Sequence, residues 1–187
     1  MVEFAFSKYS GCGNDFILID NRTNAFPYNS QVIARLCRRP DGVGADGLIL
    51  LEESQHADYK MRIFNADGGE AEMCGNGLRC LKKFALELGI TAPLLQVETM
   101  ERTLQIEMVG ESVKTSMGDP TDVQMNILLP MDSQKVIVHY LNTGVPHAIH
   151  FVEDVQKVSV RLLGPEIRYH PLFQPKGANA NFVQIEY

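Results

Sequence analysis

The sequence predicts an α+β fold with many short strands and few helices. Short apolar runs separated by Gly, Asn, Asp and Pro recur through the 187 residues, as is typical of strands and turns. Few segments repeat apolar residues at intervals of three or four, as amphipathic helices do. Hydrophobic residues make up 45% of the chain and charged residues 21%, which is the ordinary composition of a globular protein.

Strands and helices alternate in the first part of the chain. Asn29 or Ser30 can cap an amphipathic helix that ends before Pro40. A second helix, with an apolar stripe, follows residue 77 and is stopped by Gly89. Strands are expected at residues 16–20, 48–51, 59–64, 94–98, 104–109 and 113–116.

A turn-forming segment, Met117-Gly118-Asp119-Pro120, predicts a domain boundary. It divides the chain into a domain of residues 1–117 and a domain of residues 118–187. In the second domain we expect a short helix near 158–163, and strands at residues 135–141, 148–152 and 181–186.

Charge and hydropathy restrict the function classes. Lys plus Arg number 17 and Asp plus Glu 23, and a net charge of -6 argues against binding to nucleic acid. No apolar run reaches the roughly 20 residues that cross a bilayer. The first residues lack the basic and then apolar segments of a signal peptide. We therefore expect a cytoplasmic protein that binds neither nucleic acid nor membranes.

The four cysteines stand at positions 12, 37, 74 and 80. In a reducing compartment they are expected to be free thiols. None forms a C-x-x-C pair, so no structural zinc site or other metal site is expected. Cys37 and Cys80 fall within the expected helices, where we expect them to pack in the core.

The tripeptide Cys-Gly-Asn occurs twice, at residues 12–14 and 74–76. The second copy stands at the start of the second expected helix, where the helix dipole favours a thiolate over a thiol. Gly75 and the backbone amides that follow it could hold a carboxylate there. The side chains of Asn14, Asn65 and Asn76 offer uncharged hydrogen bonds, which suit a zwitterionic substrate.

A thiolate beside a bound carboxylate has two reactions open to it. It could attack a carbonyl, which calls for a histidine such as His147 arriving from a distant part of the chain. It could instead remove the proton from the carbon next to the carboxylate. The residues alone leave both reactions open.

Six segments then resemble, in the same order and over nearly the whole chain, the sequences of diaminopimelate epimerases. They are SGCGNDF (10–16), DGVGADG (41–47), FNADG (64–68), MCGNGLRC (73–80), GVPH (144–147) and ANANF (178–182). The resemblance implies a cofactor-independent epimerase that inverts one α-carbon of diaminopimelate, on the route to lysine and cell-wall peptide. It also implies two similar halves, each a β-barrel-like sheet around a central helix, with the substrate between them.

The same resemblance assigns roles by position. Cys74 would be one of two cysteines that face the α-carbon from opposite sides, one taking a proton while the other donates one. Gly75 and Asn76 would hold the α-carboxylate, and His147 would tune a cysteine. Neither a cofactor nor a metal is implied. Contacts to the small-molecule substrate would come from Asn14, Asn65 and Asn179.

Structural roles compete with these assignments. Asn14 and Asn65 could simply shape turns, and His147 could be a structural histidine. Cys74 could be a small buried filler. Cys12 could substitute as a base, although the family usually has no thiol at its position.

The chain also departs from the family pattern. The family's second cysteine lies beyond the segment around Asn179, and the 187 residues contain no such segment. We therefore expect the larger part of an epimerase, with an incomplete second half, which is inactive alone and needs the missing C-terminal segment or a homodimer partner. Gly47 and Val145 replace polar residues found in other members, which leaves the specificity for the distal end of the substrate open. The alternatives are a related amino-acid racemase and a non-catalytic amino-acid-binding remnant.

Overall fold

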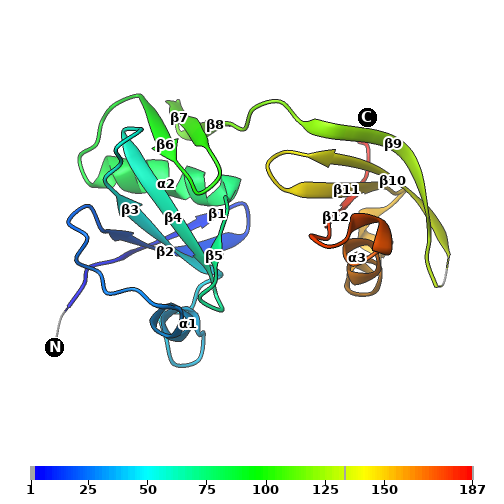
Figure 1. The fold of residues 1–187 in the computed structure, drawn as a ribbon, viewed down its shortest axis with the longest axis horizontal. Helices are drawn as coiled ribbons and strands as arrows, with labels where there is room; N and C mark the ends of the chain where they lie inside the picture. The colour runs from blue at the N-terminus through cyan, green and yellow to red at the C-terminus, as the bar shows by residue number, and fades with distance from the viewer. Residues whose placement is uncertain (1–2, 133, 187) are drawn as a thin grey trace. The chain divides into compact units, whose positions relative to one another are not determined.

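The computed structural model describes residues 3–132 and 134–186, which fall into two compact units (Figure 1). The first unit is Met1–Met117 and the second is Gly118–Tyr187. Within the described residues, no helix is long and apolar enough to cross a membrane.

An eight-stranded mixed sheet forms the frame of the first unit. Its strands run in the order β1-β2-β3-β4-β6-β7-β8, and β5 pairs with β4. Most strands that the apolar runs predict are present, with ends that differ by one or two residues. The strands are β1 (Ser7–Gly11), β2 (Asn14–Asp20), β3 (Gly47–Glu52), β4 (Tyr59–Asn65), β5 (Glu70–Ala71), β6 (Leu94–Glu98), β7 (Thr103–Val109) and β8 (Ser112–Ser116).

Helix α2 (Gly75–Glu87) packs against one face of this sheet (Figure 1). The helix contacts β1 and β8, at the two ends of the sheet, as well as β2, β3, β4 and β7. The sheet therefore curls around the helix. Three residues of the expected apolar stripe, Leu78, Leu81 and Ala85, are buried in the core between them, where Phe84 joins them, and the fourth, Leu88, packs partly buried against this core. This central helix within a curled sheet confirms the predicted fold class.

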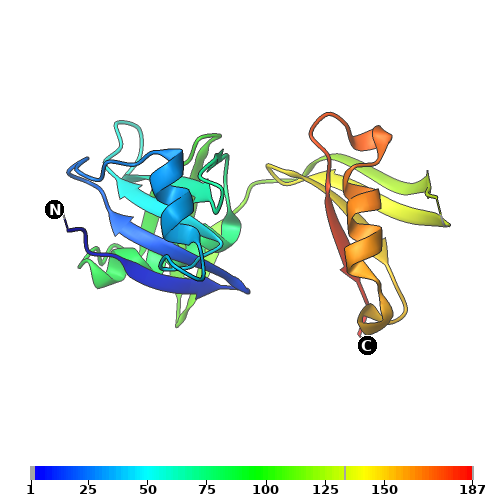
Figure 2. The ribbon, with the colours of Figure 1, turned by 90° about the horizontal axis from the view of Figure 1, so that it is seen from below.

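Helix α1 (Ser30–Cys37) covers the opposite face of the sheet (Figure 2). Asn29 caps it, since its side chain accepts a hydrogen bond from the backbone N–H of Val32 at 2.9 Å. Ile33 and Cys37 are buried against the sheet. The predicted cap and apolar face are both confirmed.

The second unit is a four-stranded sheet with helix α3 (Val160–Arg168) on one face (Figure 2). Ile167 of this helix lies in the core of the sheet. The strands run in the order β12-β11-β10-β9. They are β9 (Thr121–Pro130), β10 (Lys135–Asn142), β11 (Pro146–Phe151) and β12 (Asn179–Val183), with short 3-10 helices at Val155–Lys157 and Pro171–Phe173.

The two units share a chain path. In the first, β1 and β2 pair antiparallel, α1 follows, and β3 returns parallel to β2. In the second, β10 and β11 pair antiparallel, α3 follows, and β12 returns parallel to β11. This repetition agrees with the expectation of two similar halves.

Two strands, β5 and β9, are not expected from the sequence. Strand β5 is only two residues long, which is too short for an alternating pattern. Strand β9 is irregular, because Asp122 and Asn126 have positive φ angles and the pairing with β10 shifts register. These irregularities break the alternation that predicts a strand.

Two expected elements lie elsewhere than predicted. Strand β12 covers Asn179–Val183 rather than 181–186. Helix α3 continues past Gly164 and Pro165 to Arg168, although these residues usually end a helix. The buried side chain of Ile167 holds this last turn against the sheet.

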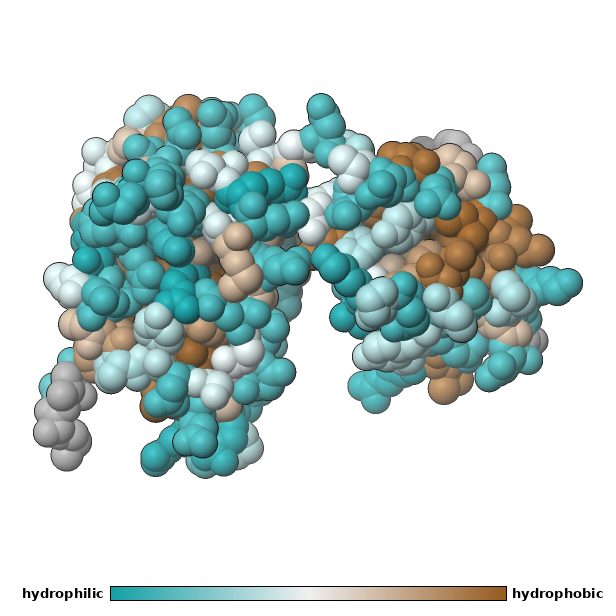
Figure 3. Space-filling view, viewed as in Figure 1, coloured by the Kyte–Doolittle hydropathy of each residue, from teal (hydrophilic) through white to brown (hydrophobic). Residues whose placement is uncertain are grey.

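The surface of the second unit carries exposed apolar side chains. Figure 3 shows hydrophobic residues gathered over β9 and β10. Met125, Leu128 and Ile137 are at least half exposed in these strands.

Candidate active site

Cys74 caps the N-terminus of helix α2. Its Sγ accepts a hydrogen bond from the backbone N–H of Gly77 at 3.4 Å, and its own backbone is extended. The side chain is half-buried at the edge of the α2 core. The structure thus places the sulfur at a helix start, as the sequence predicts, beside backbone N–H groups of the first turn of α2.

Asn14 and Asn65 lie at the same end of the sheet of the first unit. Asn14 is the first residue of β2 and Asn65 is the last residue of β4. Strand β3 joins them, because Gly47 pairs with Asn65 on one side and with Phe16 on the other. Both asparagines belong to strand ends rather than to the loops in which we expected them.

Both asparagines also face helix α2. Phe16, Ile49 and Ile63 point into the α2 core. Alternate residues of a strand point to the same face of the sheet. Asn14 lies two residues before Phe16, and Asn65 lies two residues after Ile63, so both asparagines are on the face that α2 covers. A Cβ on Gly77 would lie 3.0 Å from Ile49 Cδ1 and 3.1 Å from Ile63 Cδ1, so the first turn of α2 rests on this part of the sheet. The sheet end and the helix start therefore lie next to each other.

A chain of hydrogen bonds connects the helix start to the sheet. Asn76 Nδ2 donates to Asn14 Oδ1 at 2.9 Å. Arg79 donates to Asn76 Oδ1 at 2.5 Å, and Asn14 Nδ2 donates to Asp46 Oδ2 at 3.3 Å. The two predicted substrate-binding residues are thus in direct contact.

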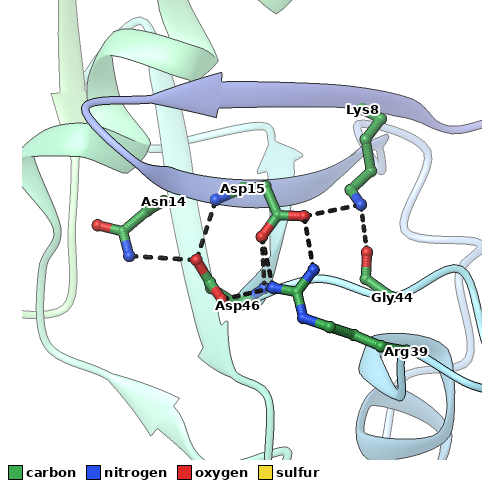
Figure 4. A network of polar contacts seen from close by, with 6 residues as sticks. All are labelled: Lys8, Asn14, Asp15, Arg39, Gly44 and Asp46. Atoms are coloured by element: carbon green, nitrogen blue, oxygen red, sulfur yellow. Dashed lines mark hydrogen bonds and ion pairs between the residues drawn. The ribbon is translucent and has the colours of Figure 1, made fainter.

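An ionic cluster holds the far end of this chain (Figure 4). Arg39 binds Asp46 at 2.7 Å and Asp15 at 2.8 Å, and Lys8 binds Asp15 at 2.9 Å. Lys8 also donates to the carbonyl of Gly44. The hydrogen bonds from Arg39 and Lys8 hold the pKa of Asp15 well below its usual value.

A tight turn follows Asn65. The backbone N–H of Asn65 donates to the carbonyl of Gly69 at 2.8 Å, and Gly68 donates to the carbonyl of Asn65 at 2.9 Å. Gly68 has a φ of +87°, and a Cβ there would lie 2.1 Å from the carbonyl oxygen of Ser30. Only glycine fits this position, so the turn is fixed against the start of α1.

The other cysteines have different surroundings. Cys37 and Cys80 are buried, as expected. Burial, with a smaller contribution from the nearby Cys74 and Cys12, raises the pKa of Cys80 to about 11. Cys12 is exposed in the turn between β1 and β2, where its Sγ accepts a hydrogen bond from Arg79 at 3.5 Å. Cys74 is the cysteine that combines partial exposure with a helix start.

His147 and Asn179 lie side by side in the second unit. They pair across strands β11 and β12. Asn181 joins them, because its Nδ2 donates to the carbonyl of Asn179 at 2.8 Å and lies 3.1 Å from His147 Nδ1. Arg168 donates to Asn179 Oδ1 at 2.8 Å. His147 Nδ1 therefore lies beside the side-chain amide of Asn181, which in turn contacts Asn179.

The structure gives a reason for one departure from the family pattern. A Cβ on Gly47 would lie 2.5 Å from the carbonyl oxygen of Phe64. Any larger residue there would require the backbone of β4 to move. Val145 lies just before β11, and nothing in the structure explains its presence.

Four further residues of these clusters were missed by the sequence reasoning. Arg79 lies three residues after Asn76, a spacing that puts two side chains on one face of a helix. Asn181 lies two residues after Asn179 and so shares its strand face. Asp46 and Arg168 carry no comparable local signal, since tertiary contacts bring Asp46 to Asn14 in the first unit and Arg168 to Asn179 in the second. Within the described residues, no group of three or more His, Cys, Asp or Glu side chains could hold a metal ion.

Comparison with known proteins gives consistent sequence matches. A family model described as diaminopimelate epimerase matches residues 6–123. A diaminopimelate epimerase of Aquifex aeolicus is 41% identical over 96% of the chain and 68% of its own length. One from Methanocella arvoryzae is 42% identical over 100% of the chain and 71% of its own length.

Solved structures match the fold at low sequence identity. A probable proline racemase from Agrobacterium radiobacter K84 has a TM-score of 0.69 and 14% identity, over 98% of this chain and 67% of that one. A hydroxyproline epimerase from Agrobacterium vitis has a TM-score of 0.64 and 15% identity, over 87% of this chain and 59% of that one. The chain thus spans about three fifths to two thirds of these solved chains, and the likeness concerns the fold.

Proposed function

The chain belongs to the diaminopimelate epimerase family, and from this premise we propose that it takes part in epimerising LL-diaminopimelate to the meso form, with Cys74 as an acid–base thiol. The substrate is a small amino acid, and the mechanism needs no pyridoxal cofactor. A net charge of -6 supports a role away from nucleic acid. A thiol that must stay reduced supports a cytoplasmic location.

The position of the Cys74 sulfur carries the proposal. It is half-buried and accepts the Gly77 N–H at the positive end of a helix. A thiolate there can take the α-proton of a bound amino acid, so that an S–H bond forms as the C–H bond breaks. The electron pair of that bond stays on the α-carbon and is delocalised into the neighbouring carboxylate.

The residues around Cys74 would hold that carboxylate. The backbone N–H groups at Gly75 and Asn76 belong to the first turn of α2, where few carbonyls compete for them. Asn14 and Asn65 lie on the same side of the sheet and would bind other polar groups of the substrate. Hydrogen-bonding side chains of this kind orient a ligand without adding charge.

The second unit would supply further contacts. We assign substrate binding to Asn179 and the tuning of a cysteine to His147. Their pairing across β11 and β12, with Asn181 between them, supports a shared role. In this proposal residues 1–117 form the half that carries Cys74, and residues 118–187 form part of the other half.

Inversion requires a proton donor on the opposite face of the α-carbon. A single thiol returns the proton to the face from which it took it. The 187 residues hold no cysteine beyond Cys80, so we propose that this polypeptide alone exchanges the α-proton without inverting the centre.

The test is incubation of the 187-residue chain with LL-diaminopimelate in D2O. We expect deuterium at the α-carbon, measured by mass spectrometry, and no meso product on a chiral column. Cys74→Ser should lower the exchange rate at least about 100-fold, because the hydroxyl is a far weaker acid. The matched control, Cys37→Ala, alters a buried thiol on the other face of the sheet and should keep the rate within about twofold.

Each other result contradicts the proposal in a different way. Binding of diaminopimelate without exchange would indicate a non-catalytic remnant. Exchange on proline but not on diaminopimelate would indicate a related racemase. Formation of the meso product by the pure chain would show that no second cysteine is needed.

A further inference from the structure

We infer that Arg79 and Asp46 are positioning residues that set the orientation of the Asn76 and Asn14 side-chain amides. The inference rests on the proposed function, in which these two amides lie in the substrate site. The four side chains form one continuous chain of hydrogen bonds, from helix α2 to the start of β3.

The direction of this chain is fixed by its ends. An asparagine amide has an oxygen that accepts and a nitrogen that donates, and it can turn over to exchange them. A guanidinium can only donate, and a carboxylate can only accept. With Arg79 at one end and Asp46 at the other, one arrangement alone satisfies all three hydrogen bonds. Both oxygens then face Arg79, and both nitrogens face Asp46.

This arrangement decides what the site offers to a ligand. Each Nδ2 group of Asn14 and Asn76 uses one of its two N–H groups within the chain of hydrogen bonds. Among the described residues, the second N–H of each is left over for a ligand acceptor. If Arg79 were removed, Asn76 could turn over and bring its oxygen against Asn14 Oδ1. The pair would then lose its hydrogen bond and its common orientation.

The two ends are themselves held in place. Arg79 lies one helical turn after Asn76 on α2, so its guanidinium reaches back along the helix. Asp46 Oδ2 also accepts the backbone N–H of Asp15 at 3.1 Å, and Asp46 Oδ1 binds Arg39 (Figure 4). Arg39 therefore occupies the oxygen that Asn14 does not use.

The experiment uses two sets of variants of the 187-residue chain. Arg79→Met removes the donor, Arg79→Lys keeps a donor, and Lys83→Met removes a cation one turn further along α2 as the matched control. Asp46→Asn replaces the acceptor with a group that can also donate. Its control, Asp41→Asn, neutralises an exposed carboxylate that pairs with Arg38 instead of with the four side chains.

Two readouts are combined for every variant. The first is the pair of side-chain amide signals of Asn14 and Asn76 in 1H–15N NMR spectra, which needs no ligand. The second is the KM and maximal rate of α-proton exchange on LL-diaminopimelate. We expect Arg79→Met and Asp46→Asn to shift both pairs of signals and to raise KM roughly tenfold, as loss of a hydrogen bond to a charged group would.

The maximal rate should change less than about threefold, since Cys74 is untouched. Arg79→Lys should have a KM close to that of the unmodified chain, because it keeps a donor. The KM of the two controls should stay within about twofold of the unmodified chain. Unshifted amide signals in Arg79→Met would overturn the chain of hydrogen bonds itself. Shifted signals with an unchanged KM would overturn the positioning role. If the unmodified chain neither binds nor exchanges diaminopimelate, the proposed function fails and the substrate role of the amides fails with it.

Discussion

The side chain of Asn76 donates a hydrogen bond to the side chain of Asn14 across 2.9 Å. The two residues are 62 positions apart in the sequence, one in the first turn of α2 and the other at the start of β2. Their contact joins the start of α2, which Cys74 caps, to the first residue of strand β2. The site is therefore held by two rigid elements, and a small displacement of either would alter the space beside the sulfur.

The first prediction concerns protection of Cys74 by the substrate. We expect LL-diaminopimelate at ten times its Kd to slow alkylation of Cys74 by iodoacetamide about tenfold, because the ligand would cover the sulfur. Cys12 is exposed and serves as the internal reference, with a rate that should change less than about twofold. Peptide mass spectrometry measures both rates in one sample.

A ligand control sharpens this experiment. 1,5-diaminopentane has both amino groups of diaminopimelate but neither carboxylate. It should give no protection if the helix start holds a carboxylate. Equal protection by the two compounds would contradict the assignment of Gly75 and Asn76 to carboxylate binding.

Much of the fold could be predicted from local patterns. The apolar stripe from Leu78 to Leu88 predicts the central helix, and Asn29 with Pro40 brackets α1. Strand β9 could not be predicted in the same way, since its bulges at Asp122 and Asn126 hide the alternation. An irregular strand is stabilised by pairing with neighbouring strands, and the local sequence does not show which strands those are.

Part of the candidate site could likewise be predicted from local sequence, and part of it could not. The helix start at Cys74 follows from the sequence, because a Cys-Gly-Asn segment precedes a helical repeat. The contact between Asn76 and Asn14 does not follow, because it depends on how α2 lies on the sheet. Asp46 is likewise recruited through the parallel pairing of β2 with β3, which brings its carboxylate beside Asn14.

The second prediction compares two glycines with similar backbone angles. Gly68 and Gly89 have φ angles of +87° and +81°. Gly89→Ala should lower the free energy of unfolding by about 1 kcal/mol, because alanine disfavours a left-handed backbone and its Cβ would meet no other atom there. Gly68→Ala should cost at least about 2 kcal/mol more, because its Cβ would meet the Ser30 backbone. Urea unfolding measures both, and equal losses would contradict the tight fit of the turn after Asn65.

The third prediction concerns acid stability. The pKa of Asp15 is lowered in the folded chain by its hydrogen bonds to Arg39 and Lys8. A lowered pKa contributes stability above the ordinary value of 3.8, and this contribution is lost as the pH falls below it. Asp15→Asn should therefore lower the free energy of unfolding by about 1 kcal/mol near neutral pH, with partly exposed partners limiting the effect.

The difference between Asp15→Asn and the unmodified chain should shrink when urea unfolding is repeated at about pH 3. Asp41→Asn is the matched control, because its ion pair with Arg38 is more than half exposed on both sides. It should change the free energy of unfolding by less than about 0.5 kcal/mol at either pH. A difference for Asp15→Asn that does not depend on pH would indicate lost packing rather than a lost ion pair.

The last prediction concerns alkaline stability and the buried thiol of Cys80. Burial raises its pKa from 9.0 to about 11, so the folded chain keeps its proton where the unfolded chain releases it. The stability that this thiol contributes is complete below pH 9 and is lost as the pH rises toward 11. Relative to Cys80→Ala, the unmodified chain should therefore lose about 2 kcal/mol between about pH 8 and about pH 10.5. Lys82 also has a shifted pKa, but burial alone causes it in both proteins, so its contribution cancels in the difference. The raised pKa of Tyr9 comes mainly from burial and Glu87 and only in its smallest part from Cys80, so its contribution largely cancels as well. A constant difference across this range of urea unfolding experiments would show that the Cys80 thiol ionises in the folded chain as it does in the unfolded one.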